Sequence, residues 1–175
     1  GSTFSALQDV NTLGIGVSPV NVLEVALNPA FNDVYVGGSF TAAGGVANTT
    51  RLARFNGSNW QPVGGGIDNG QVNAIVIDND AIVYVGGTFT SVGGGTPAAG
   101  IAMWDGKFWL PLGSGVTGGE VHTLALHPDG SLYVGGSFTN AGGVPGTSYL
   151  AKWDNGWEAL PEGTPNGHVY ALYAD

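Results

Sequence analysis

One eight-residue segment recurs at a fixed interval along this chain of 175 residues and limits the folds that are open to it. It reads VYVGGSFT at Val34–Thr41, VYVGGTFT at Val83–Thr90 and LYVGGSFT at Leu132–Thr139, so each copy begins 49 residues after the one before. Repeats of this length are typical of units of four short strands, which stack because one unit alone cannot bury its apolar faces. The repeat therefore predicts an all-β fold built from stacked antiparallel units.

Each unit divides into four expected strands, A to D, separated by turn residues. Strand A is an alternating run, and it appears four times, at Val22–Asn28, Val72–Asp78, Val121–His127 and Val169–Ala174. Turns rich in Asn, Pro, Asp and Gly lead into the VYVGG strand, which is B. A longer loop leads to strand C, with the sequence LARF, IAMW or LAKW, and a tight turn leads to strand D at Trp60–Val63, Trp109–Leu112 and Trp157–Leu160.

The unit boundaries predict a single β-propeller domain, or propeller segment, over residues 1–175. Three full blades of about 49 residues are expected at 20–68, 69–117 and 118–166. Residues 1–19 align on strands C and D of a unit and residues 167–175 on strand A, which makes the two ends complementary halves of a split blade. The ring can close within one chain, between two copies, or as part of a longer array. We expect a dimer or other ring-closing oligomer, because an open arc exposes apolar blade faces.

The most regular positions of the repeat are expected to serve the scaffold. Paired glycines occupy strand B at Gly37–Gly38, Gly86–Gly87 and Gly135–Gly136, where glycine is costly unless a neighbouring group approaches closely. Aromatic pairs recur in register with them, at Phe55 with Trp60, Trp104 with Trp109 and Trp153 with Trp157. Such rings provide apolar area between blades, and the indole N–H can reach a carbonyl oxygen.

The pattern VGGxFTxAGG…AxWDG…WxxLGxG resembles the kelch-type propeller repeat, in the variant found in large bacterial and fungal surface propellers. The resemblance covers about Phe4 to Tyr173, with three matches in fixed register. It implies the propeller fold and leaves the function open, because this family includes copper oxidases, cytosolic adaptor domains and surface adhesion modules. The copper-oxidase ligand set includes a cysteine, and this chain has none.

Charge and composition narrow the range of partners. Thirteen acidic residues against four basic ones disfavour a phosphate backbone, which is held by clustered Lys and Arg, so we expect no nucleic acid partner. No apolar run of about 18 residues occurs, and no membrane insertion is expected. Scarce lysine and abundant Gly, Ser, Thr and Asn favour an extracellular protein, at a cell or virion surface.

The candidate binding residues lie where the units differ, on the expected face of the B–C and D–A loops. Differences carried by loops on a rigid scaffold are typical of recognition sites. Around the start of strand A these residues are Asn21, Gln71, Asn73, Glu120, His122, His168 and Tyr170, and the B–C loops add Asn48, Arg51 and Tyr149. Amide, carboxylate and aromatic groups suit a glycan or a protein ligand, and so a non-enzymatic, lectin-like or adhesive role.

Two alternatives remain open at this point. One is a purely structural segment, natural or engineered, that assembles with copies or neighbours and holds no small ligand. The other is a metal-dependent hydrolase or lyase that uses Glu120, His122 and His168. Because no ligand motif with short spacing occurs, the sequence predicts no catalytic residue, no metal ligand and no cofactor.

Overall fold

The computed structural model describes residues 22–28, 31 and 33–174, and these form three antiparallel four-stranded sheets. Sheet 1 contains, in spatial order, β1 (Val22–Leu27), β2 (Val34–Gly38), β3 (Leu52–Phe55) and β4 (Trp60–Pro62). Sheet 2 contains β5 (Val72–Ile77), β6 (Val83–Gly87), β9 (Ile101–Trp104) and β10 (Trp109–Pro111). Sheet 3 contains β12 (Val121–Leu126), β13 (Leu132–Gly136), β15 (Leu150–Trp153) and β16 (Trp157–Glu158).

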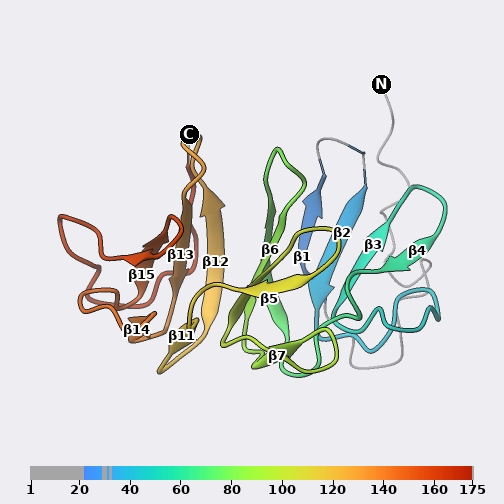
Figure 1. The fold of residues 1–175 in the computed structure, drawn as a ribbon, viewed down its shortest axis with the longest axis horizontal. Helices are drawn as coiled ribbons and strands as arrows, with labels where there is room; N and C mark the ends of the chain where they lie inside the picture. The colour runs from blue at the N-terminus through green and yellow to red at the C-terminus, as the bar shows by residue number, and fades with distance from the viewer. Residues whose placement is uncertain (1–21, 29–30, 32, 175) are drawn as a thin grey trace.

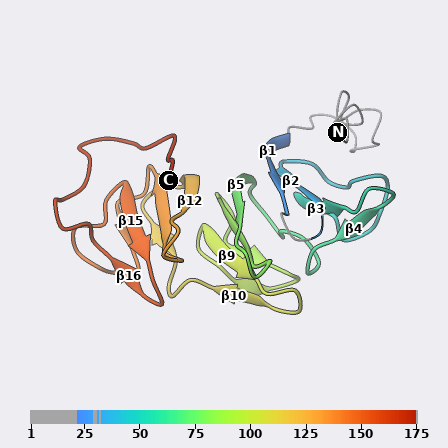
Figure 2. The same cartoon turned by 90° about the horizontal axis from the view of Figure 1, so that it is seen from above.

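The three sheets stand side by side along the chain (Figure 1). Seen from above they form an arc, with β1, β5 and β12 on its inner side and β4, β10 and β16 on its outer side (Figure 2). The predicted all-β fold of antiparallel four-stranded sheets is confirmed, and each sheet follows the expected order A to D. Among the described residues, no helix has the length and apolarity needed to cross a bilayer.

Short ladders connect the loops of neighbouring sheets, and the repeat did not predict them. Strand β11 (Val116–Thr117), in the loop after sheet 2, pairs with β14 (Asn140–Ala141) in the B–C loop of sheet 3. A single bridge between Ile67 and Val92 does the same between sheets 1 and 2. Strand β7 (Ser91–Val92) also pairs with β8 (Thr96–Pro97) inside one B–C loop. The D–A and B–C loops therefore lie on one face, as expected.

The apolar core lies between sheets. Between sheets 1 and 2, Tyr35 and Leu52 pack with Val83 and Val85, and both valines are fully buried. Between sheets 2 and 3, Ile101, which is equivalent to Leu52, packs with Leu132 and Val134, which are equivalent to Val83 and Val85. Since Leu52 and Ile101, Val83 and Leu132, and Val85 and Val134 are each 49 residues apart, the two junctions use aliphatic side chains at equivalent positions.

The paired glycines have two different roles. A Cβ atom on the first glycine would meet a valine of the following segment, 2.5 Å away for Gly37 and Val72. A Cβ atom on the second would instead collide with a backbone carbonyl oxygen of its own sheet, that of Gln71 for Gly87 and that of Glu120 for Gly136. The first glycine thus allows sheets to stack, and the second allows strand B to pair with strand A.

The aromatic pairs pack as predicted. The ring centroids lie 5.2 Å apart for Phe55 and Trp60, and 5.5 Å apart for Trp104 and Trp109. The Trp109 indole N–H donates to the Gly64 carbonyl oxygen over 3.0 Å, which joins sheet 2 to the loop after sheet 1. These aromatic residues are therefore part of the scaffold.

A buried threonine hydroxyl organises the B–C loop in sheets 1 and 3. Thr49 Oγ1 accepts the Ala43 N–H at 2.7 Å and donates to the Val46 carbonyl oxygen at 2.6 Å. Thr147 makes the equivalent bonds to Ala141 and Val144, at 2.8 and 2.7 Å. Both threonines are fully buried, so each loop is held from beneath.

Two expectations about the strands need correction. Residues 169–174 lie against sheet 3 but are not a strand, because no strand B pairs with them among the described residues. Strand D is also shorter than expected, most clearly in sheet 3, where β16 ends at Glu158. The expected half-blade at 1–19 lies outside the described residues, so ring closure and blade number stay predictions.

Candidate functional site

Six of the candidate side chains flank the first valine of three successive segments on the inner side of the arc, which are β5, β12 and residues 169–174. Val72 and Val121 are fully buried, and Val169 is half-buried against Gly135. Because neighbouring residues of an extended chain point to opposite faces, the residues on either side of each valine point away from the core. These flanking residues are Gln71 and Asn73, Glu120 and His122, and His168 and Tyr170.

The backbone at this point is fixed by a hydroxyl from strand B. The N–H of Gln71 donates to Thr88 Oγ1 at 3.0 Å, and the N–H of Glu120 donates to Ser137 Oγ at 3.1 Å. Thr88 and Ser137 follow the paired glycines of their units, so the same local sequence fixes the backbone just before β5 and just before β12.

A network of side-chain amides joins the start of β5 in sheet 2 to the start of β12 in sheet 3. Gln71 Nε2 donates to Asn73 Oδ1 at 2.8 Å. Asn73 Nδ2 in turn donates to Glu120 Oε2 at 3.3 Å and to the Val121 carbonyl oxygen at 2.8 Å. Asn73 therefore orients the Glu120 carboxylate and connects two inner strands.

Aromatic rings continue the same line of side chains beyond sheet 3. The His122 and Tyr170 rings are stacked, with centroids 4.7 Å apart and planes 22° apart. His168 Nδ1 lies 3.3 Å from the Tyr170 hydroxyl, and the His168 ring lies 5.5 Å from that of Tyr149. We call the whole set the polar-aromatic strip, and its members are Gln71, Asn73, Glu120, His122, Tyr149, His168 and Tyr170.

Tyr149 reaches the strip from a left-handed backbone position. Its φ is 68°, and the equivalent residues Arg51 and Gly100 have φ values of 62° and 73°. Glycine adopts this conformation freely, whereas other residues do so at a cost that is often met at functional positions. In sheet 2 the residue is glycine, and a Cβ atom there would meet Val116. The conformation directs Tyr149 over the next inner segment.

Arg51 does not belong to the strip, although the sequence suggested it as a ligand-binding residue. Its Nε donates to the Gly70 carbonyl oxygen at 2.7 Å, and its Nη1 donates to that of Ile67 at 3.1 Å. The guanidinium group thus fastens the loop that leads into β5. The repeat alignment carried a hint of this unusual backbone, since Arg51 aligns with a glycine.

The other two candidates are not brought into the strip. Asn48 is exposed at a φ of 62°, and no contact among the residues that the structure describes joins it to the strip. Asn21 lies outside the described residues.

The strip does not have the character of a metal centre. Within the described part of the chain, no group of three or more His, Asp or Glu side chains could hold a metal ion. The His122 and His168 rings are 6.5 Å apart, and Tyr170 stacks on one and bonds the other. What the strip offers is a row of amide and carboxylate groups next to exposed aromatic rings, with Tyr170 68% exposed.

Comparisons with known proteins do not assign the chain to a family. Neither the protein-family models nor the curated proteins contain a match. Among solved structures, the chain is similar to one described as "YCF48 bound to D1 peptide", with a TM-score of 0.40 and 16% identity. The match covers 80% of this chain and 52% of the other, so the chain spans about half the length of that protein.

Proposed function

We propose that this chain is a non-enzymatic recognition module, part of a kelch-like β-propeller, that binds a glycan or a protein through its B–C and D–A loop face. The observation that carries the proposal is the polar-aromatic strip, in which seven side chains from three successive units form two interacting groups. One group is Gln71, Asn73 and Glu120, the other is the four rings, and Glu120 and His122 are two residues apart on the chain. A strip of this kind is expected for binding more than for stability, because its aromatic rings lie outside the core.

The chemistry of the strip favours a ligand rich in hydroxyl or amide groups. Exposed faces of Tyr170 and His168 provide surfaces on which a sugar ring or a peptide side chain can stack. Glu120 and Gln71 provide a carboxylate and an amide that bond hydroxyl or amide groups. An acidic chain with this strip fits a role outside the cell, in adhesion or lectin-like recognition.

Binding to a defined glycan array and to a displayed peptide library tests the proposal. For a ligand found in either, Tyr170→Ala, His168→Ala and Glu120→Gln are expected to weaken binding by about tenfold or more, as loss of a central contact usually does. Phe108→Ala is the matched control, since Phe108 is an exposed aromatic residue in a C–D turn. No ligand in either screen, or a ligand unaffected by all three substitutions, would contradict the proposal.

Self-association is the second candidate, either as a step in ligand binding or as the sole function of a structural segment. It is favoured by the face of β1 that is turned away from sheet 2, where Val25 and Leu27 are each 47% exposed. Ile75 and Leu124, which are equivalent to Val25 in sheets 2 and 3, are 4% and 6% exposed, because they pack on the preceding sheet. Light scattering of the wild type and of Val25→Asp tests this, and a monomer mass for both would contradict it.

A further inference from the structure

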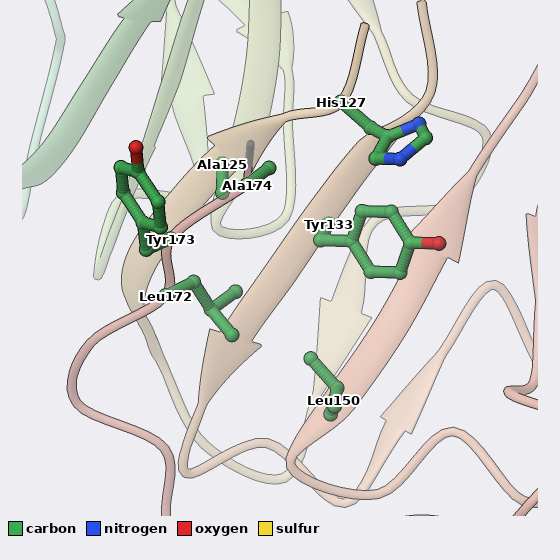
Figure 3. A pocket seen from close by; sticks show the side chains of 7 residues that line it. All are labelled: Ala125, His127, Tyr133, Leu150, Leu172, Tyr173 and Ala174. Carbon is green, nitrogen blue, oxygen red and sulfur yellow. The ribbon is translucent and has the colours of Figure 1, made fainter. Parts of the chain in front are cut away.

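An open hollow of about 380 Å³ lies on the face of sheet 3 that is turned away from sheet 2. Tyr133 and Leu150 of sheet 3 form one side, and Leu172 and Tyr173 form the other (Figure 3). We propose that this groove is a docking site for one extended β-strand of the sequence class Val-Xaa-Val-Gly-Gly, presented by a further repeat unit of this type.

The first argument is that the same side chains are covered at the two other junctions. Leu52 and Ile101, which are equivalent to Leu150, are fully buried, whereas Leu150 is only half-buried. Leu52 packs in one cluster with Val83 and Val85, and Ile101 packs in another with Leu132 and Val134. In both junctions, therefore, strand B of the following sheet contributes two alternate aliphatic side chains to the cluster that buries this position.

The second argument is that residues 169–174 already occupy the place of strand A. Val169 lies 2.7 Å from a Cβ atom built on Gly135, as Val72 lies 2.5 Å from one on Gly37. The Val169 N–H also donates to the Gly136 carbonyl oxygen at 3.1 Å. The inner segment of the next unit is thus in position against sheet 3.

The third argument is that the backbone of this segment is ready to pair. In the part of the chain that the structure describes, the N–H and C=O groups of Ala171 and Tyr173 have no hydrogen-bond partner, and Tyr173 is 87% exposed. The equivalent strands β5 and β12 pair along their length with β6 and β13. An unpaired edge of this kind is a template for one added strand.

The register of β5 with β6 specifies what that strand must contain. Val72 lies opposite Gly87, Ala74 opposite Gly86 and Ile75 opposite Val85. Transferred by the repeat, Val169 lies opposite the second glycine of the docked strand, Ala171 opposite the first, and Leu172 opposite the second valine. A Cβ atom on the second glycine would then collide with the His168 carbonyl oxygen, as it would with that of Gln71 at Gly87.

The two glycines of the docked strand therefore differ in a way that can be measured. The first glycine makes room for a valine of a following sheet, and this groove contains no following sheet among the described residues. Ala171 also leaves space there, as Ala74 does in sheet 2. An alanine is thus tolerated at the first glycine and excluded at the second.

The test uses the whole chain and fluorescein-labelled VYVGGSFT, the sequence of Val34–Thr41, in an anisotropy titration. We expect saturable binding with one site per chain. VYVAGSFT is expected to bind within about threefold of the parent peptide, and VYVGASFT at least about tenfold more weakly. Because both alanine peptides meet the same folded protein, this comparison does not depend on any protein variant.

A groove variant and a mass measurement complete the experiment. Leu172→Asp, with its circular dichroism unchanged, is expected to bind the parent peptide at least about tenfold more weakly, since it puts a charge beside the docked valine. Equal affinity for the two alanine peptides would overturn the proposal. So would absence of binding, or a stable dimer that the peptide does not dissociate, because a second copy would then cover the groove with a surface other than a Val-Xaa-Val-Gly-Gly strand.

Discussion

The Asn73 side chain donates a hydrogen bond to the Val121 carbonyl oxygen over 2.8 Å, and so joins the innermost strands of two successive sheets. The same amide nitrogen lies 3.3 Å from Glu120 Oε2. One asparagine thus contributes both to the packing of sheets and to the strip proposed for binding.

Asn73→Ala is expected to lower the free energy of unfolding by about 1–2 kcal/mol, because it leaves the partly buried Val121 carbonyl without its donor. Urea denaturation measures the change. Gln71→Ala is the control, with an expected loss below about 0.5 kcal/mol, since it removes one side-chain bond at the edge of the strip. Equal losses for the two variants would contradict the assigned role of Asn73.

Trp157→Phe is expected to cost at least about 1 kcal/mol of stability, because the Trp157 indole N–H donates to the Leu112 carbonyl oxygen at 2.9 Å in a buried position. Trp109→Phe, which removes the equivalent bond to Gly64, is expected to cost a similar amount. Thermal and urea unfolding of both variants measure this. A wild-type midpoint for either one would show that its indole bond contributes nothing to stability.

Gly87→Ala is expected to cost about 3 kcal/mol or more, or to prevent folding, since its Cβ atom would collide with the Gln71 carbonyl oxygen. Gly156→Ala is the matched control. Nothing lies within 4 Å of a Cβ atom built there, and its φ is not positive, so a change below about 0.5 kcal/mol is expected. Expression yield and urea midpoints compare the two, and a stable Gly87→Ala protein would disprove the close approach.

Stability is expected to fall in acid. Backbone N–H groups of Phe108 and Lys107 hold the pKa of Asp105 below its ordinary value of 3.8. The hydroxyl and N–H of Ser131, together with His127, hold the pKa of Asp129 far below the same value. A carboxyl group whose folded-state pKa is lowered stabilises the fold above its unfolded pKa, and this contribution is lost as the pH falls through the folded value.

The urea midpoint measured at steps between about pH 6 and pH 2 should therefore drop most steeply below about pH 4. In the double variant with Asp105→Asn and Asp129→Asn, the drop is expected to be smaller, because neither side chain titrates. Glu24 acts in the opposite direction, since burial raises its pKa and protonation then favours the folded state. An equally steep drop in the double variant would contradict the role of these two turns.

Much of the fold could be predicted because its signals are local and repeated. Strand β9 covers Ile101–Trp104, the residues that the repeat assigned to strand C, and the indole bonds to carbonyl oxygens were anticipated from residue type. The loop ladder between Val116 and Ala141 could not be predicted, since a two-residue pairing leaves no periodic pattern.

The site could be predicted only where strand positions determine it. Asn73 and His122 lie in the strip because each follows a buried valine. The contacts of Arg51 could not be predicted, because its partners are main-chain carbonyl oxygens, which have no signature in a sequence. Residues 169–174 have the sequence pattern of strand A but are not a strand in the structure, because an alternating sequence forms a strand only when a partner strand lies beside it.

The buried hydroxyls of Thr49 and Thr147 separate the two tasks of each B–C loop. Each hydroxyl bonds two backbone groups of its own loop, and in sheet 3 the Asn140 side chain adds bonds to the Gly143 N–H and the Val144 carbonyl oxygen. The segments 42–48 and 140–146 have the same length and end at the same anchor. The exposed residues of these segments that make none of these bonds are therefore the positions at which a chosen surface can be installed one unit at a time.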